Sequence, residues 1–262
     1  MIVPELNIAV GLGCLNQPLK QALHTAHRLG ASGVEIDLRN SHWPKEITDT
    51  GIRQLKKVMN DLNLQVATAR FQTRRGYDVA DDLERRIDAT KAAMKTAYRL
   101  GTRVLVNSVG MIPEDTESVA YGQLQESLAD LAHFGQHVGT LLACETGSEP
   151  VERLVELLDS LPERAIGVAY NPGSLIVQQN FSGESTKAAA ARILSVTACD
   201  GVRDLSLGRG LSVPLGQGSA EFEQILAVLE DVPYRGWFVV DRPASRDALT
   251  ELSNAIKFLK SL

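Results

Sequence analysis

Short apolar segments alternate regularly with longer amphipathic ones along the chain, and this pattern limits the possible folds. Eight segments have the length and β-rich composition of strands: residues 6–12, 33–38, 64–71, 102–108, 140–147, 165–171, 195–201 and 236–241. After each of them, apolar residues recur at helical spacing, within residues 17–30, 49–63, 81–101, 116–139, 149–162, 184–194, 219–232 and 245–262. Apolar strands without polar alternation are typical of a parallel sheet covered on both faces. Eight such units in 262 residues predict a (β/α)8 TIM barrel, an α/β fold with one domain over residues 1–262.

An open, doubly wound sheet is the alternative architecture. That fold usually carries a glycine-rich phosphate turn, with three glycines at fixed spacing, after its first strand. Here Gly11 and Gly13 are followed by no third glycine before the next helix. A Gly-x-Gly pair alone is weak support for a dinucleotide site, so the closed barrel is preferred. Residues 205–218 are rich in glycine and are predicted to form a loop at the barrel top rather than a domain boundary.

Composition and charge argue against two classes of partner. Hydrophobic residues make up 44% of the chain, which is enough for a well-filled core. The net charge of −5 argues against nucleic acid as the main partner, although a local cationic pocket is compatible with it. No apolar run is long enough to span a membrane, and the N-terminus lacks the pattern of a secretory signal. We therefore expect neither a nucleic-acid partner nor a membrane.

The cysteines indicate a reducing compartment. Cys14, Cys144 and Cys199 are far apart, lack CxxC spacing and lie in apolar, strand-like surroundings. Buried free thiols explain this pattern better than a zinc site. We therefore expect a cytoplasmic protein. The sequence does not determine the oligomeric state, and a homo-oligomer is compatible with it.

Two carboxylates stand out at the strand ends, where barrels of this kind place their chemistry. Glu145 follows the apolar run Leu-Leu-Ala-Cys, and Asp241 follows Trp-Phe-Val-Val. A carboxylate at the end of a buried strand must be paired, hydrogen-bonded or bound to metal. A catalytic or ligand-binding role is one explanation for both residues. An ion pair with a rim arginine, such as Arg242 beside Asp241, is the other.

Arginines cluster in the same predicted loops. They are Arg39, Arg70, Arg74, Arg75, Arg203, Arg209 and Arg242. Any one of them fits a solvated rim position, but together they indicate a ligand with a phosphate or carboxylate group, which guanidinium matches in geometry. From these loops and strand ends we select as substrate-binding candidates Arg39, His42, Trp43, Arg70, Arg74, Asn107, Asn171, Thr197 and Arg203.

The chain resembles the xylose-isomerase-like barrel family of sugar-phosphate isomerases and epimerases. The resemblance extends from residues 28–38 through residues 143–147 and 166–175 to the segments Pro-Leu-Gly-Gln-Gly-Ser-Ala-Glu-Phe and Tyr-Arg-Gly-Trp-Phe-Val-Val near the C-terminus. These last two segments are specific in their order and spacing. The resemblance implies the same barrel and a small-molecule substrate, a sugar or a sugar phosphate.

The resemblance also implies a divalent metal held by Glu, Asp, His and Glu at the ends of strands five to eight. The matching positions here are Glu145, Asn171, Thr197 and Asp241. The Asp-Pro-Gly-His motif of the sixth strand therefore becomes Asn-Pro-Gly-Ser, ending at Ser174. This set has two charges instead of three and no imidazole, which mid-series transition metals favour. A hard cation such as magnesium can use oxygen ligands of this kind, with more water in its shell.

Two hypotheses of function follow. In the first, the chain is an isomerase or epimerase in which Glu145 and Asp241 act as the acid/base pair and as ligands of magnesium or manganese. In the second, the family metal site is largely lost, and the barrel binds a small anionic or polyhydroxylated ligand without metal and without turnover. The retained arginines favour the second hypothesis for the chemistry, whereas the resemblance favours the first for the kind of protein.

Overall fold

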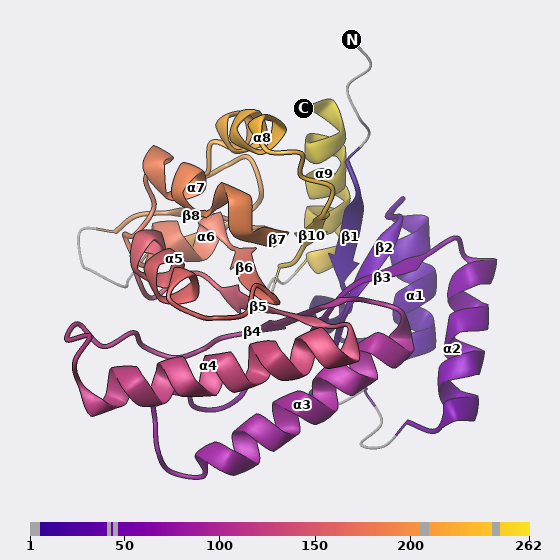
Figure 1. The fold of residues 1–262 in the computed structure, drawn as a ribbon. Coiled ribbons are helices and arrows are strands. Elements are labelled where there is room, and N and C mark those ends of the chain that lie inside the picture. The colour runs from indigo at the N-terminus through magenta and orange to yellow at the C-terminus, as the bar shows by residue number, and fades with distance from the viewer. Residues whose placement is uncertain (1–5, 41–42, 44–46, 205–209, 243–246) are drawn as a thin grey trace.

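The computed structural model describes residues 6–40, 43, 47–204, 210–242 and 247–262, and it forms a closed barrel of eight parallel strands (Figure 1). The barrel strands are β1 (Ile8–Gly11), β2 (Gly33–Asp37), β3 (Gln65–Arg70), β4 (Val104–Asn107), β5 (Leu141–Glu145), β6 (Ile166–Tyr170), β7 (Ile193–Ala198) and β10 (Trp237–Val240). Closure is made by β1, which pairs with β2 on one side and with β10 on the other. The predicted (β/α)8 barrel is therefore confirmed.

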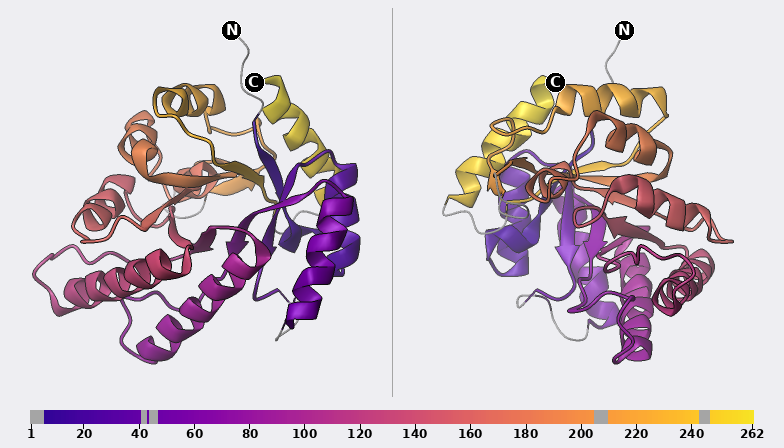
Figure 2. Two further views of the ribbon diagram at one scale, coloured as in Figure 1. Left: turned by 45° about the vertical axis from the view of Figure 1, so that its right-hand side comes forward. Right: turned by 90° about the vertical axis from the view of Figure 1, so that its left-hand side faces the viewer.

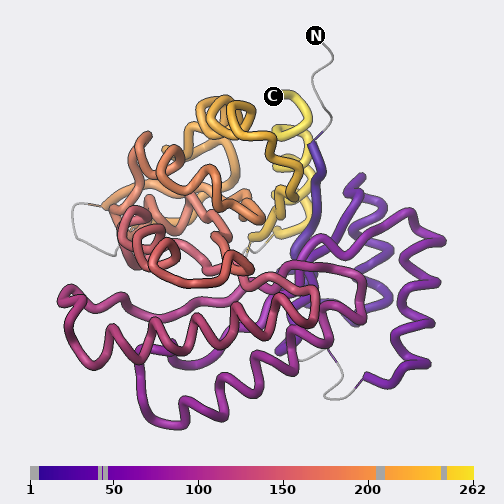
Figure 3. The backbone as a smooth tube through the Cα atoms, viewed as in Figure 1, coloured from indigo at the N-terminus to yellow at the C-terminus, as the bar shows by residue number. Residues whose placement is uncertain are grey.

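Helices form the outer ring around these strands (Figure 2). They are α1 (Leu19–Arg28), α2 (Asp49–Asp61), α3 (Leu83–Leu100), α4 (Val119–Val138), α5 (Val151–Asp159), α7 (Gly183–Ala189), α8 (Phe222–Asp231) and α9 (Ala248–Ser261). Local sequence explains several of their ends. Ser118 caps α4 by accepting a hydrogen bond from the Tyr121 amide at 3.2 Å, and Gly139 ends that helix with φ of 84°. The two longest helices, α3 and α4, lie side by side (Figure 3).

Some elements were not expected from the sequence. A short 3-10 turn, η1 (Leu12–Leu15), follows β1, and the Asn-Pro-Gly-Ser motif opens a short helix, α6 (Pro172–Val177). The seventh strand was expected to reach residue 201, but β7 ends at Ala198. A separate antiparallel hairpin, β8 (Asp200–Val202) with β9 (Leu211–Val213), follows it. Part of the loop predicted over residues 205–218 is therefore a strand.

Small side chains form two clusters in the barrel interior, and Trp237 packs against one of them. One inner cluster contains Ala9, Ala67 and Val239, and another contains Val106, Ala143 and Ala169. Side chains alternate between the two faces of a strand, so the residue two positions after an inward-facing one also points inward. That position is Glu145 after Ala143, Asn171 after Ala169 and Asp241 after Val239. The strand period therefore brings a polar layer to the carboxyl-terminal mouth, directly above an apolar one.

A membrane-spanning helix is not found in the described part of the chain, since no helix there combines the needed length with the needed apolar character.

Candidate functional site

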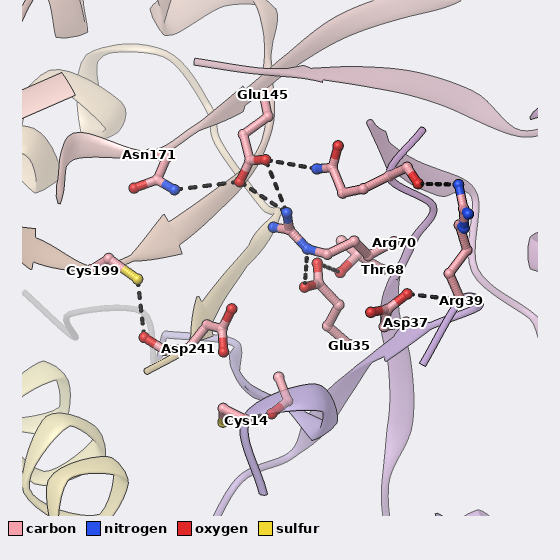
Figure 4. A network of polar contacts seen from close by, with 12 residues as sticks. Cys14, Glu35, Asp37, Arg39, Thr68, Arg70, Glu145, Asn171, Cys199 and Asp241 are labelled. Atoms are coloured by element: carbon pink, nitrogen blue, oxygen red, sulfur yellow. Dashed lines mark hydrogen bonds and ion pairs between the residues drawn. The ribbon is translucent and has the colours of Figure 1, made fainter. Parts of the chain in front are cut away.

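Arg70 lies at the centre of the barrel mouth, between two carboxylates. Its Nε donates a hydrogen bond of 2.7 Å to Oε1 of Glu35 on β2. Its Nη1 donates to both oxygens of Glu145 on β5, at 3.0 and 2.9 Å. Glu35 is only 3% exposed, and Thr68 donates to its second oxygen at 2.8 Å. The guanidinium thus links β2, β3 and β5 in one charge-assisted network (Figure 4).

This pairing keeps Arg70 charged. Burial alone would lower the pKa of Arg70, but the negative charges of Glu35 and Glu145 outweigh it and hold that pKa well above its ordinary value. Among the described residues, no hydrogen bond is made by the remaining nitrogen, Nη2. Figure 4 shows it pointing into the space between Asn171, Cys199 and Asp241. The mouth therefore presents one permanently charged N–H donor that no described residue occupies.

Glu145 is surrounded by donors on every side. Besides Arg70, its Oε2 accepts from the amide of Gln72 at 2.7 Å, and its Oε1 accepts from the amide of Asn171 at 3.3 Å. Gln72 is fixed in turn, because its own side-chain oxygen accepts from the backbone N–H of Ser108 at 2.9 Å. The Glu145 carboxylate is therefore neutralised and oriented by residues of the chain itself.

Asn171 connects the mouth to α6. Its side-chain oxygen accepts from the backbone N–H of Ser174 at 2.9 Å, which caps the short helix, and Pro172 follows at the first helical position. Because the donor is a backbone N–H, the acceptor must be the amide oxygen, so the NH2 group faces Glu145. At this position the mouth therefore receives an N–H donor and no oxygen ligand.

Asp241 has a different environment across the mouth. It is partly buried, and burial raises its pKa from 3.8 to about 6; the charge of Glu35 acts in the same direction and Arg70 opposes it. The nearby Cys14 thiol lowers this pKa, although its hydrogen bond of 2.9 Å is donated to the backbone carbonyl of Gly11. The structure pairs Asp241 with no lysine or arginine of the described residues. Its carboxylate lies close to β1, since a Cβ on Gly11 would be 3.0 Å from Oδ1.

The two predicted catalytic residues, Glu145 and Asp241, thus lie in one layer with Arg70 and Asn171. The other substrate-binding candidates are spread more widely. Thr197 is buried on β7, and Asn107 is buried on β4, where its amide donates to the Tyr77 hydroxyl at 3.1 Å. Trp43 packs against the hydrophobic core as a partly buried side chain.

The remaining arginines lie outside the central network. Arg39 donates to the backbone carbonyl of Gln72 at 2.8 Å, and with Arg74 it lines a cavity beside β3. Arg203 donates to the Phe181 carbonyl at 2.6 Å. Arg242 pairs with Glu251 at 2.5 Å and so joins the β10 end to α9. The predicted candidate His42, like Arg209, lies outside the described residues.

Asp200, the first residue of β8, supports a loop. Its two oxygens accept from four backbone N–H groups, those of Gly201, Gly216, Gly218 and Ala220, at 2.8 to 3.1 Å. The side chain is 1% exposed. The glycine-rich stretch around Gly216 and Gly218 is therefore folded around this one carboxylate.

Glu35 and Thr68 were missed in the sequence. A signal was present for Glu35, because it is a carboxylate between two apolar residues of a strand, Val34 and Ile36. The same argument selected Glu145. The register between β2 and β3 shifts at Val34/Glu35, and this irregularity pairs Glu35 with Thr68. No pattern in the sequence predicts such a shift.

The strand order and the helical ring define a (β/α)8 barrel, a fold that carries its sites at the carboxyl-terminal face where the polar layer lies. A model of the xylose isomerase-like TIM barrel family matches residues 23–262, and the chain belongs to this family. Its relatives include an inosose dehydratase from Clostridium botulinum, 24% identical over 276 aligned positions that cover 91% of this chain and 86% of the relative.

Three solved structures show the same fold. A xylose isomerase domain protein from Planctomyces limnophilus superposes with a TM-score of 0.86 at 20% identity, covering 98% of this chain and 97% of that one. The D-psicose 3-epimerase of Clostridium cellulolyticum H10, solved with D-tagatose, gives 0.78 at 12% identity, with 98% and 99% covered. A family protein from Mycobacterium smegmatis, in complex with magnesium, gives 0.77 at 14% identity, with 98% and 96% covered.

Proposed function

We propose that the chain binds a small polyhydroxylated carbonyl compound, of the ketose or inosose type, at the barrel mouth. We further propose that Arg70 supplies there the positive charge that the family resemblance assigns to a divalent metal. The observation that carries the proposal is the position of the Arg70 guanidinium between Glu35 and Glu145. The names of the relatives support the ligand class, since they include an inosose dehydratase and a D-psicose 3-epimerase.

The side chains at the mouth do not form a set of ligands that fits a divalent cation. Such a cation requires oxygen ligands with free lone pairs directed at one point. Both oxygens of Glu145 already accept from Arg70, and the Asn171 oxygen accepts from Ser174. Within the described residues, no group of three or more His, Cys, Asp and Glu side chains is placed to hold a metal. A cation at this point would also be repelled by the Arg70 guanidinium.

The same groups fit a polyol. The Nη2 of Arg70 can donate to a carbonyl or hydroxyl oxygen, and the Asp241 carboxylate can accept from a hydroxyl. Hydroxyl-rich ligands need donors and acceptors of both kinds within one small pocket, so that no buried polar group remains unpaired. Arg70 and Asp241 provide one of each.

Ligand binding without metal tests this proposal directly. Isothermal titration calorimetry in the presence of EDTA, with D-psicose, D-tagatose and an inosose as probes, should give saturable binding for at least one of them. Arg70→Lys keeps the positive charge but loses the planar, forked guanidinium group. It should therefore weaken that binding by about tenfold or more. The exposed Arg53→Lys substitution on α2 is the matched control and should change nothing. Binding that appears only when magnesium or manganese is added would refute the proposal.

Proton transfer is a second candidate function, and the surroundings of Asp241 favour it. A carboxylate with a pKa of about 6 is well matched to accept a proton near neutral pH. In this reaction the Asp241 carboxylate takes the proton from the carbon next to the carbonyl. The electrons of the C–H bond form the enolate, whose oxygen receives a hydrogen bond from Arg70. Glu145 serves to position Arg70, because its oxygens are already occupied.

Hydrogen exchange separates binding from catalysis. If Asp241 transfers protons, the ligand incubated in D2O should gain deuterium at the carbon next to its carbonyl, as measured by NMR. Asp241→Asn should abolish this exchange while calorimetric binding persists. Binding without exchange in the unaltered protein would instead identify a barrel that binds its ligand without turnover.

A further inference from the structure

A cationic cavity lies beside the mouth and is lined by the segment after β2, the β3–α3 connection and the start of α3. Its volume is about 410 Å³, within the range of small-molecule sites. Five arginines line it: Arg39, Arg74, Arg75, Arg85 and Arg86. The cavity shares the β3–α3 connection with the mouth, because Arg39 donates to the backbone carbonyl of Gln72, whose side chain holds Glu145.

The charge of this cavity is opposite to that of the chain. Its acidic lining residues are Asp81 and Asp82, which leaves a formal charge of +3 from five arginines and two aspartates. The whole chain has a net charge of −5. Asp81 pairs with Arg75 at 2.8 Å, but both side chains are more than half exposed, so this pair is weak and exchanges readily with a ligand. The cavity is therefore a local attractor for anions.

The N-terminus of α3 adds to this positive field. Asp82 holds the cap position of this 18-residue helix, but its backbone is left-handed, with φ of 54°, and its side chain makes no capping hydrogen bond. An uncapped helix start leaves backbone N–H groups available and carries the positive end of the helix dipole. Anions bind at such helix starts for both reasons.

Arg86 is held in place by the same loop. Its two terminal nitrogens donate to the backbone carbonyls of Val79 and Asp81. Its Nε is buried and finds no acceptor among the described residues. Arg39 is likewise oriented, since its guanidinium lies 5.7 Å from the centre of the Phe71 ring. Arg39 and Arg86 are thus held in place by contacts that do not neutralise them.

We infer that this cavity is an anion-binding site, and that it takes a phosphate-type group with two or more negative charges. Guanidinium forks match tetrahedral oxyanions through paired hydrogen bonds, and several forks around one cavity favour a multiply charged group over a single carboxylate. The volume exceeds what one inorganic phosphate fills, which favours a small organic phosphate. This inference does not depend on what binds at the mouth.

Calorimetry with inorganic phosphate and with glucose 6-phosphate at low ionic strength tests the site. The double variant Arg74→Gln/Arg85→Gln removes two exposed lining arginines that the fold does not require. The matched control is Arg53→Gln/Arg164→Gln, which makes the same charge change at two exposed positions outside the cavity. We expect the first pair to weaken binding by about tenfold or more and the control to weaken it by less than about twofold.

The outcomes distinguish an organic phosphate from free phosphate. They also distinguish binding in this cavity from ligand binding at the mouth. Tighter binding of glucose 6-phosphate than of inorganic phosphate identifies an organic phosphate as the occupant, whereas equal binding identifies free phosphate; both support the site. No binding by the unaltered protein, or equal weakening in the two double variants, overturns it. The neutral ketoses used for the mouth carry no phosphate, so failure there leaves this result unaffected.

Discussion

Two carboxylates face the barrel mouth from β5 and from the end of β10, and their surroundings are opposite. Glu145 accepts hydrogen bonds from an arginine, a glutamine and an asparagine. Asp241 has a thiol neighbour and a pKa raised to about 6. Both occupy strand ends where family relatives are expected to hold a metal. The difference shows that equivalent positions in one barrel can become a fixed internal ion pair on one side and a titratable group on the other.

The largest expected effect is on stability and comes from removing Arg70, the cation that pairs with Glu145. Arg70→Met leaves Glu35 and Glu145 without their counter-ion in a buried layer. Removing one partner of a buried pair costs about 3–5 kcal/mol. Urea denaturation followed by circular dichroism should show a loss of that size. Arg74→Met, at an exposed position, is the control and should change stability by less than about 0.5 kcal/mol. A loss below about 1 kcal/mol for Arg70→Met would mean that the pair does not matter to the fold.

The next effect is also on stability. It concerns Asp241 and depends on pH. The folded-state pKa of Asp241 is raised above its unfolded value, from 3.8 to about 6, so the folded protein binds the extra proton. The contribution of Asp241 to the free energy of unfolding is therefore fully present below pH 4. It decreases as the pH rises to about 6, by at most about 3 kcal/mol. Asp241→Asn should remove this loss, so the variant gains on the unaltered protein between pH 4 and 7. A constant difference across that range would contradict the raised pKa.

Glu145→Gln should have a smaller effect on stability, and it should also change the pKa of Asp241 across the mouth. The amide keeps one acceptor for Arg70 but loses the charge, so we expect a loss of about 1–3 kcal/mol. Because the charge of Glu145 raises the pKa of Asp241, the variant should lower that pKa. Carboxyl-carbon NMR titration of Asp241 in both proteins measures this change. An unchanged pKa would show that the two sides act independently.

Cys14→Ala should have the smallest effect of the series. The polar Cys14 thiol beside the Asp241 carboxylate lowers the pKa of that carboxyl, so its removal should raise the pKa of Asp241 further. The stability change should stay within about 1 kcal/mol, because the side chain is small and partly exposed. The same NMR titration measures the shift. A lowered pKa would mean that the thiol does not favour the ionised form of this carboxylate.

The barrel and the two mouth carboxylates were predictable from the sequence for a physical reason. Strand alternation has a period of two and helical amphipathicity a period of 3.6, so both leave local signals. Glu145 and Asp241 each end an apolar strand, which marks them as costly unless satisfied. Their partners leave no such signal, because pairing between β2 and β3 depends on barrel closure and on the shift at Glu35. The sequence therefore indicated that Glu145 needs a partner, but not that Arg70 provides it.

The short elements were not predicted from the sequence, for a different reason. The helix α6 has six residues, too few for a periodic pattern, and its start coincides with a turn motif. The hairpin of β8 and β9 depends on Asp200, which joins distant backbone amides. Both elements are defined by single side chains acting over several residues rather than by composition.

A manganese titration monitored by electron paramagnetic resonance tests whether Arg70 takes the place of a metal at the mouth. The unaltered protein should show no manganese site with an affinity better than about 100 µM that depends on Glu145, because the guanidinium already neutralises this carboxylate. The Glu145→Gln variant should therefore give the same titration as the unaltered protein. Stoichiometric manganese binding that is present in the unaltered protein and lost in Glu145→Gln would show that Arg70 does not replace a metal.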